Sequence, residues 1–188
     1  IMIARNLIYV SLFAIGTSCV TDETTVTIGF GSCNEPTQTQ GLLPTLSKAL
    51  DTLDQYIWLG DNVYLVDSQW NTYAATMTRY NEVFGGVAFQ EILGKSDHLA
   101  IWDDHDAGPN DCDLSTYNGF STTVQAFKDF WQPPYPQPDS TSYYGRTFLA
   151  EGKIDIYLLD NRSFRTHRDS ANATVFGEKQ LNWFHKTL

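Results

Sequence analysis

The sequence predicts an α/β protein with a parallel sheet, because short apolar runs alternate with segments whose apolar residues recur at helical spacing. The short runs are apolar at nearly every position, which is typical of strands that are covered on both faces. The chain has 188 residues, of which 42% are hydrophobic and 18% charged, so we expect one domain with a sizeable core.

The first 19 residues have the pattern of an export signal. Arg5 precedes an apolar stretch at 7–15, and small residues then lead to Cys19. This order is typical of a secretory signal, and it also resembles a lipoprotein signal in which a lipidated Cys19 anchors the chain to a membrane. The alternative is a core strand at 7–13. We expect an exported protein (periplasmic, cell-surface or secreted) with a signal at 1–19, a leader at 20–25 and one domain at 26–188.

The elements of that domain follow in order from their patterns. Strands are expected where apolar residues run together or alternate, helices where they recur every three or four residues, and breaks at clusters of Gly and Pro. These patterns predict strands at 26–30, 56–59, 99–102, 143–149 and 154–159, and helices at 42–53, 71–84, 89–93, 124–131 and 177–188.

Four of the predicted strands lead into polar side chains, namely Cys33, Asp61, Asp104 and Asp160. Open α/β sheets bind ligands at the carboxyl ends of their strands. We therefore expect these four groups to converge at one edge of the sheet.

The acidic segment at 103–106 carries the strongest chemical signal. Its sequence is Asp-Asp-His-Asp, directly after an apolar strand. Carboxylates crowded in this way repel one another unless a cation neutralises them, so the segment predicts a metal site. The alternative is an exposed acidic loop that binds nothing. His105 has three possible roles, as a metal ligand, a phosphate-binding donor or a general acid.

Three other residues have a functional and a structural interpretation. For Cys33 the interpretations are a thiolate ligand, a small buried apolar residue, or the partner of Cys112 in a disulfide. Asp61 with Tyr64 forms a ligand pair, or Asp61 only shapes a turn. Arg162 binds phosphate, or it forms a salt bridge that fixes the end of a strand.

The charge balance limits the class of partner. With 12 Lys and Arg against 22 Asp and Glu, the formal net charge is −10. This argues against a nucleic acid as a stable partner, since binding to phosphates needs clustered basic residues. The sequence also has no P-loop, serine-elbow or Cys-x-x-Cys pattern, so P-loop chemistry, acyl transfer by a serine triad and hydride transfer are poorly supported.

Several motifs together resemble the alkaline phosphatase D (PhoD-like) family of metallophosphatases, over residues 26–188. The most specific are Gly-Asp-Asn-Val-Tyr at 60–64 and Trp-Asp-Asp-His-Asp at 102–106. Weaker ones, in the same order as in the family, are Gly-Ser-Cys-Asn at 31–34, Gly-Pro-Asn-Asp at 108–111, Leu-Asp-Asn-Arg at 159–162 and Gly-Glu-Lys-Gln-Leu-Asn-Trp-Phe at 177–184.

The resemblance implies a calcineurin-like α/β sandwich that hydrolyses phosphate monoesters or diesters through a metal-bound hydroxide. It implies iron and calcium as cofactors, although residue types alone allow other divalent metals. By position, Cys33, Asp61 and Tyr64 resemble iron ligands, with Asp61 bridging. Asp104 and Asn110 lie where further metal or substrate contacts are made. His105 and Arg162 match residues that act on the phosphate ester, Arg162 also as a binding group.

The family's later Gly-Asp-x-His motif does not appear before Leu188. The resemblance therefore covers the N-terminal part only, and we expect the first half of the sandwich, truncated at its C-terminus. The alternative to an enzyme is a non-catalytic exported metal-binding module, or an inactive fragment of such an enzyme.

Overall fold

The computed structural model describes residues 25–35, 41–152 and 154–188. The predicted signal at 1–19, with Cys19, lies outside the described residues, as does all of the leader except its last residue. Three strands form a parallel sheet in the order β1 (Ile28–Gly31), β2 (Gln55–Leu59) and β3 (Asp97–Ile101). The predicted α/β class with a parallel sheet is confirmed.

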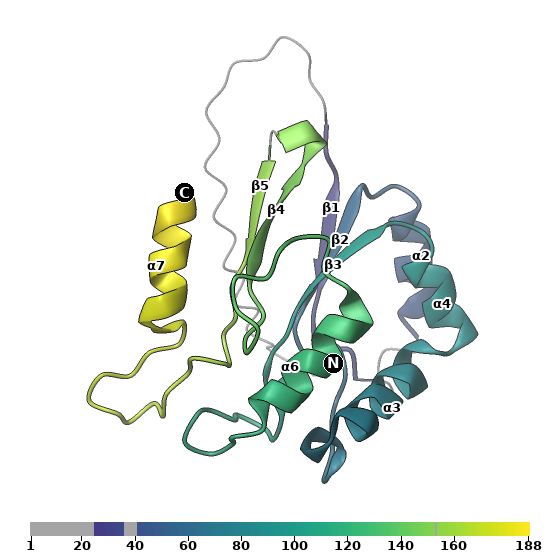
Figure 1. The fold of residues 1–188 in the computed structure, drawn as a ribbon. Helices are drawn as coiled ribbons and strands as arrows, with labels where there is room; N and C mark the ends of the chain where they lie inside the picture. Colours follow the sequence, from purple (N-terminus) through teal and green to yellow (C-terminus); the bar gives the residue numbers. More distant parts are fainter. Residues whose placement is uncertain (1–24, 36–40, 153) are drawn as a thin grey trace, which may run out of the picture.

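Helices cover one face of this sheet, on the right of Figure 1. They are α2 (Leu43–Leu50), α3 (Tyr73–Phe84), α4 (Val87–Leu93) and α6 (Phe120–Trp131). Tyr56, Trp58 and Ala100 belong to the same buried core as the apolar side chains of these helices. Aromatic rings supply much of this core. For example, Trp58 meets Phe84 edge to face, with ring centroids 5.5 Å apart, which is a favoured arrangement of two rings.

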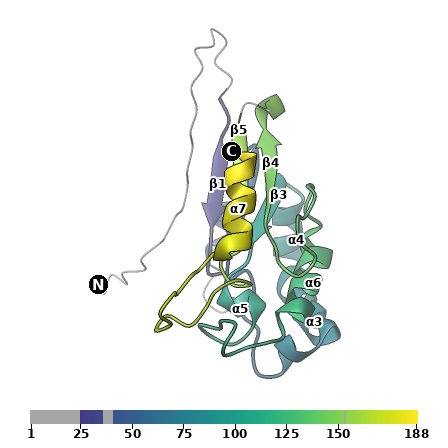
Figure 2. The same cartoon turned by 60° about the vertical axis from the view of Figure 1, so that its left-hand side comes forward.

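A separate antiparallel pair covers the other face. It consists of β4 (Gly145–Leu149) and β5 (Ile154–Leu158), and Leu158 packs with Ile57 and Leu99 of the parallel sheet. Helix α7 (Gly177–Thr187) lies outside this pair (Figures 1 and 2), where Tyr157 meets Phe184. The described residues thus form four layers: helices, a three-stranded sheet, a two-stranded sheet and α7.

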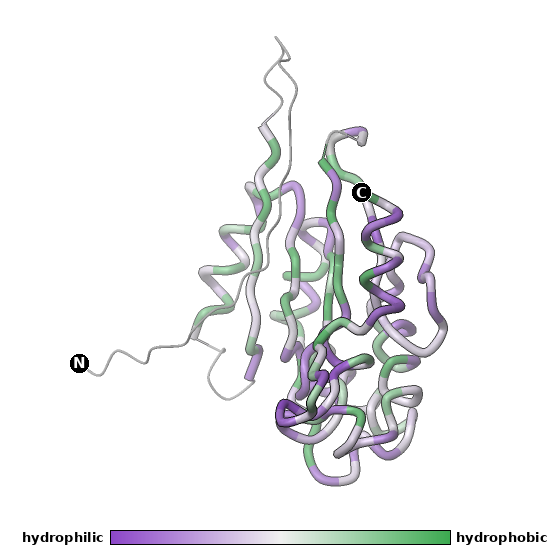
Figure 3. Tube along the Cα trace, turned by 90° about the vertical axis from the view of Figure 1, so that its left-hand side faces the viewer, coloured by the Kyte–Doolittle hydropathy of each residue, from purple (hydrophilic) through white to green (hydrophobic). Residues whose placement is uncertain are grey.

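The distribution of hydropathy agrees with this layering. Figure 3 shows hydrophobic colour along the strands, and mostly hydrophilic colour on the helix that ends at the marked C-terminus. Within the described part of the chain, no helix is both long enough and apolar enough to cross a membrane.

The observed elements differ from the predicted ones mainly at their ends. The helix predicted at 42–53 ends at Leu50, because Asp51 and Thr52 form a turn. The strand predicted at 143–149 begins at Gly145, because the backbone N–H of Tyr143 donates to Asp160 instead of to a strand. The short helix α5 (Asp104–Ala107) was not predicted, since four residues are too few to show helical spacing. Two 3₁₀ turns complete the fold, at Gln69–Asn71 and Ala150–Gly152.

Candidate metal centre

The loops after β2 and β3 meet at the carboxyl end of the parallel sheet, near α5 (Figure 2). Gly60 allows this approach. Its φ is +97°, and a Cβ atom there would lie 2.7 Å from the Cβ of Asp103, which is closer than real Cβ contacts come. Only glycine fits such a position without strain, so the glycine of the Gly-Asp motif brings the two loops together.

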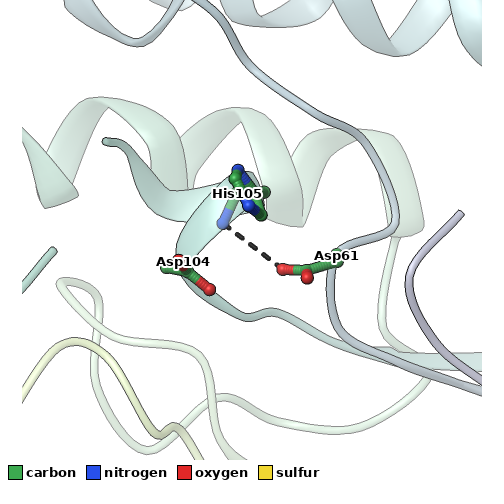
Figure 4. Close-up of side chains that lie close together, drawn as sticks. All are labelled: Asp61, Asp104 and His105. Carbon is green, nitrogen blue, oxygen red and sulfur yellow. Dashed lines mark hydrogen bonds between the residues drawn. The ribbon is translucent and has the colours of Figure 1, made fainter. Parts of the chain in front are cut away.

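Asp61, Asp104 and His105 offer ligand atoms that all lie within 4.8 Å of one another. Figure 4 shows Asp61 on the loop after β2, facing the start of α5 where Asp104 and His105 lie. The backbone N–H of His105 donates to Oδ1 of Asp61 at 3.4 Å. Two carboxylates and one imidazole from two adjacent loops form a donor set suited to a divalent cation.

The electrostatics of the cluster also suit a cation. Burial, together with the smaller effects of the nearby Asp104 and Asp103 carboxylates, raises the pKa of Asp61 to about 6. Uncompensated negative charge in a partly buried position is costly, and a positive ion would remove that cost. The predicted repulsion between carboxylates is therefore present, and it acts on Asp61.

Cys33 and Tyr64 lie beside Asp61, as the pattern of strand ends predicts. The Cys33 thiol contacts Oδ2 of Asp61 at 3.6 Å, and the Tyr64 hydroxyl donates to the same oxygen at 3.4 Å. Burial, together with Asp61, raises the pKa of both side chains. Both therefore stay protonated near neutral pH, and they would bind a metal as thiolate and phenolate only by releasing protons.

The backbone at this edge is constrained. Cys33 and Asp61 have φ angles of 59° and 52°, in the left-handed region that side chains other than glycine seldom adopt. Hydrogen bonds from Cys33 N to Gly60 O and from Asn34 N to Asp61 O hold the two turns together. Such constrained positions are concentrated at functional sites, where they fix the direction of a side chain.

Arg162 is buried, and its guanidinium group is paired with carboxylate and carbonyl groups of the same chain. Its Nε donates to Asp103, one terminal nitrogen lies 3.5 Å from Asp104, and the other donates to the carbonyl oxygen of Cys112. With 5% of its surface exposed, it has little room for a substrate. The salt bridge considered for Arg162 thus exists, but its main partner is Asp103 and not the adjacent Asp160.

Two predicted members of the acidic cluster lie elsewhere. Asp106 is fully buried and accepts hydrogen bonds from Asn62, Val63, Asp103 and Tyr80. Burial raises its pKa to about 8, with a smaller contribution from Asp61. Asp103 caps α5 and pairs with Arg162. Of the three carboxylates at 103–106, only Asp104 joins the candidate metal cluster.

Asp160 does not join the cluster either, which corrects the expected convergence of four strand ends. Its oxygens accept from Trp102 Nε1 and from the backbone N–H groups of Tyr143, Arg162 and Ser163. Its strand, β5, belongs to the second sheet. The end of β5 does lie beside that of β3, where Asn161 and Arg162 donate to Asp103, but the four donors to Asp160 keep its carboxylate out of the cluster.

A solved structure of PhoD has a similar fold. The TM-score is 0.67 at 16% sequence identity, and the match covers 86% of this chain and 38% of that one. The chain thus spans well under half of the PhoD chain, and at this identity the likeness shows the fold alone. No family model matches the sequence, and no curated protein matches it.

Within this PhoD-like fold, the remaining predicted residues are placed as follows. Asn110 is exposed on the loop after α5, and its amide donates to Asp111, whose backbone N–H in turn donates to Asp104. Its role as a ligand stays a prediction. Cys112 is buried while Cys33 is exposed, and both thiols are free, so the disulfide considered between them is not formed.

Sequence reasoning missed the residues that hold the cluster in place, above all Asn62 and Tyr80. Asn62 donates to Asp106 and to the carbonyl oxygen of Ile101, and Tyr80 donates to Asp106 from α3. Asn62 lies inside the Gly-Asp-Asn-Val-Tyr motif, and this position could have marked it as a functional residue. Tyr80 gives no such indication, because in the sequence it resembles any apolar position of an amphipathic helix.

Proposed function

We propose that the protein is a metal-dependent phosphoesterase that hydrolyses phosphate monoesters or diesters. The observation that carries this proposal is the cluster of Asp61, Asp104 and His105 at the strand ends of a PhoD-like fold. The calcineurin-like sandwich, of which this chain would form the first half, is part of the same proposal. The four layers and the structural likeness to PhoD support it.

The donor set suggests which residues hold which ion. Asp61, between the other ligands, is suited to bridge two cations. Cys33 and Tyr64 would complete a site for a transition metal such as iron, because a thiolate and a phenolate favour such ions. Asp104, with Asn110, offers the oxygen ligands that calcium prefers. Bound cations in such a site activate water and offset the charge of the phosphate.

His105 is suited to act on the ester itself. Its ring stacks on Tyr64 with centroids 4.2 Å apart, which fixes the ring beside the cluster, and it is only half-buried. A histidine held in this way can donate a hydrogen bond to a phosphate oxygen or protonate the leaving oxygen. Arg162, whose donors are occupied, would act by holding Asp104 in place more than by binding the ester.

Hydrolysis of an aryl phosphate, measured with and without a chelator, tests this function. We expect turnover that is lost with the chelator and restored by added metal. Asp104→Asn should lower kcat/KM by at least about 100-fold. The matched control is Asp97→Asn, which changes an exposed carboxylate at the start of β3. Turnover that persists in the chelator would contradict the proposal.

A second candidate is a metal-binding module without catalysis. It is favoured by one observation, that the chain spans 38% of the PhoD chain, so much of that protein has no counterpart here. Metal analysis separates the candidates: bound metal without turnover supports the module, and absence of bound metal supports an inactive fragment.

The export of the protein is a separate proposal, which rests on the sequence of residues 1–19 alone. We propose that the mature chain begins near Cys19, with a lipid on that residue if it is membrane-anchored. Mass spectrometry of the mature N-terminus is the test, and an intact segment with Met2 would contradict export.

A further inference from the structure

We propose that Asp106 sets the affinity of the metal centre without binding the metal, by holding the loop that carries Asp61 against the loop that carries Asp104 and His105. We call its hydrogen bonds to these two loops the Asp106 clamp. This inference rests on the proposed metal site, and it adds a positioning residue to it.

Backbone N–H groups of both loops donate to the carboxylate of Asp106. Oδ1 accepts from the backbone N–H groups of Asn62 and Val63, directly after Asp61, at 3.0 and 3.1 Å, and the Asn62 N–H is shared with Oδ2 at 3.1 Å. Oδ2 accepts from the backbone N–H of Asp103 at 3.1 Å, directly before Asp104. A single carboxylate group therefore fixes the separation of the two loops.

Two further donors fix the carboxylate itself. The Tyr80 hydroxyl donates to Oδ1 from α3 at 3.1 Å, and Asn62 Nδ2 donates to Oδ2 at 3.2 Å. Asp106 and Tyr80 are fully buried and Asn62 nearly so. Each donor N–H or O–H would otherwise be unsatisfied in the interior, so the arrangement is costly to distort.

The chemistry of the clamp requires acceptors at both oxygen positions. In Asp106→Asn the side chain keeps its shape, but one oxygen becomes an NH₂ group that cannot accept a backbone N–H. With the NH₂ group at the Oδ2 position, the Asp103 N–H loses its acceptor. With it at the Oδ1 position, the Val63 N–H loses its acceptor and the Asn62 N–H keeps only the other oxygen. Groups that orient metal ligands typically change metal affinity 10–100-fold when they are mutated, although they do not touch the ion.

Asp139→Asn is the matched control. Asp139 is also buried, and its carboxylate accepts from the backbone N–H and the hydroxyl of Thr141 and from the Lys179 ammonium group. Neither donor residue lies in the loops at 60–64 and 103–106. Both variants should lose stability, whereas only the first should lose metal affinity.

The experiment titrates the 188-residue chain with Mn²⁺, and follows the unbound ion by electron paramagnetic resonance at a temperature where every variant is folded. We expect Asp106→Asn to raise the Kd for Mn²⁺ by about 10–100-fold, and Asp139→Asn to change it by less than about threefold. An unchanged Kd in Asp106→Asn, or an equal loss in both variants, would overturn the inference.

Amide hydrogen exchange of the unmodified chain gives a second readout that needs neither a variant nor a metal. The clamp predicts that the N–H groups of Asn62, Val63 and Asp103 become exposed in one common opening, because they share an acceptor. Independent opening of the two loops would contradict the clamp. A chain that binds no Mn²⁺ but shows the common opening would contradict the proposed metal site and leave the clamp standing.

Discussion

At the scale of single residues, Asp61 combines two unfavourable features. Its backbone lies in the left-handed region, and its carboxylate is partly buried near those of Asp104 and Asp103. Its pKa of about 6 exceeds the ordinary 3.8, so the folded chain binds this proton more tightly than the unfolded chain does. The associated stability is present below pH 3.8 and is lost as the pH rises through 6.

Asp61→Asn should therefore stabilise the metal-free chain at pH 7.5, by about 1–3 kcal/mol, because it removes this repulsion. Asparagine also tolerates the left-handed backbone. The same variant should lose the stabilisation that Mn²⁺ gives the unmodified chain. Urea unfolding in chelator and in Mn²⁺ measures both effects, with Asp97→Asn as the control. A metal-free variant less stable than the unmodified chain would contradict this account.

At the scale of elements, the site depends on the short helix α5. Its four residues carry Asp104 and His105, and Asp103 caps it in a reciprocal capping box with Asp106. Such a short helix is not stable by itself, so its position depends on side chains from other elements. Arg162, on the loop after β5, supplies one such contact through Asp103 and Asp104.

Arg162→Met keeps the unbranched aliphatic part of the side chain and removes the guanidinium group with its charge. It should lower the free energy of unfolding by about 3–5 kcal/mol, since it leaves Asp103 and Asp104 without their cation in a partly buried position. Arg168→Met removes the same charge from an exposed loop and should change stability by less than about 0.5 kcal/mol. Denaturant unfolding of both variants checks this, and equal effects would count against the role of the Arg162 contacts.

Strand β3 carries another titratable group, His98, which lies near the start of the strand, whereas the metal centre lies beyond its end. Its Nδ1 must accept from Trp58 Nε1, at 3.1 Å, because an indole N–H only donates. Its Nε2 then donates to the carbonyl oxygen of Ile92, so the ring is neutral. Burial lowers the pKa of His98, and the opposing effects of the Ile92 carbonyl and Asp97 are smaller.

His98 should consequently make a contribution that destabilises the folded chain in mild acid, opposite in sign to the contribution of Asp61. The unfolded chain takes up the His98 proton below pH 6.5 while the folded chain resists it, so stability is full above pH 6.5 and falls as the pH drops towards the lowered pKa. His98→Gln, which keeps one acceptor and one donor, should remove this contribution, which is at most about 1.4 kcal/mol per pH unit. Unfolding measured from pH 7.5 to 5 tests it, with the exposed His185→Gln as control. An unaltered difference between pH 7.5 and 5 in His98→Gln would contradict it.

At the scale of the whole molecule, the layers leave one strand partly uncovered. Among the described strands, β1 pairs with β2 alone, and its Phe30 is 47% exposed. Parallel sheets are normally covered on both faces, and an exposed apolar edge strand favours association with other chains.

The 188-residue chain should therefore associate as its concentration rises, and Phe30→Lys should reduce this, because a charge on an edge strand opposes pairing. Leu114→Lys adds the same charge at a residue that is 51% exposed and distant in sequence from β1, and should have little effect. Light scattering over a concentration series is the measurement. Equal reduction by both variants would show that net charge, and not the edge of β1, controls association.

The sequence predicted most elements to within two or three residues, because their patterns reflect burial on one face or on both. It also predicted that Asp61 and Asp104 lie together, since both directly follow parallel strands of one sheet. It did not predict α5, which is too short for periodicity to be visible, or the hydrogen bonds of Tyr80, whose position resembles any buried helical residue.

The sequence by itself determined the class of fold and the residue types available at the strand ends, because hydrophobic pattern and chain order are local properties. Only the tertiary structure decided which acidic side chains face one another. Asp103, Asp106 and Asp160 look equivalent to Asp104 along the chain, yet each is held by donors from distant segments. The direction of a buried carboxylate depends on which donors surround it, and those donors come together only when the layers pack.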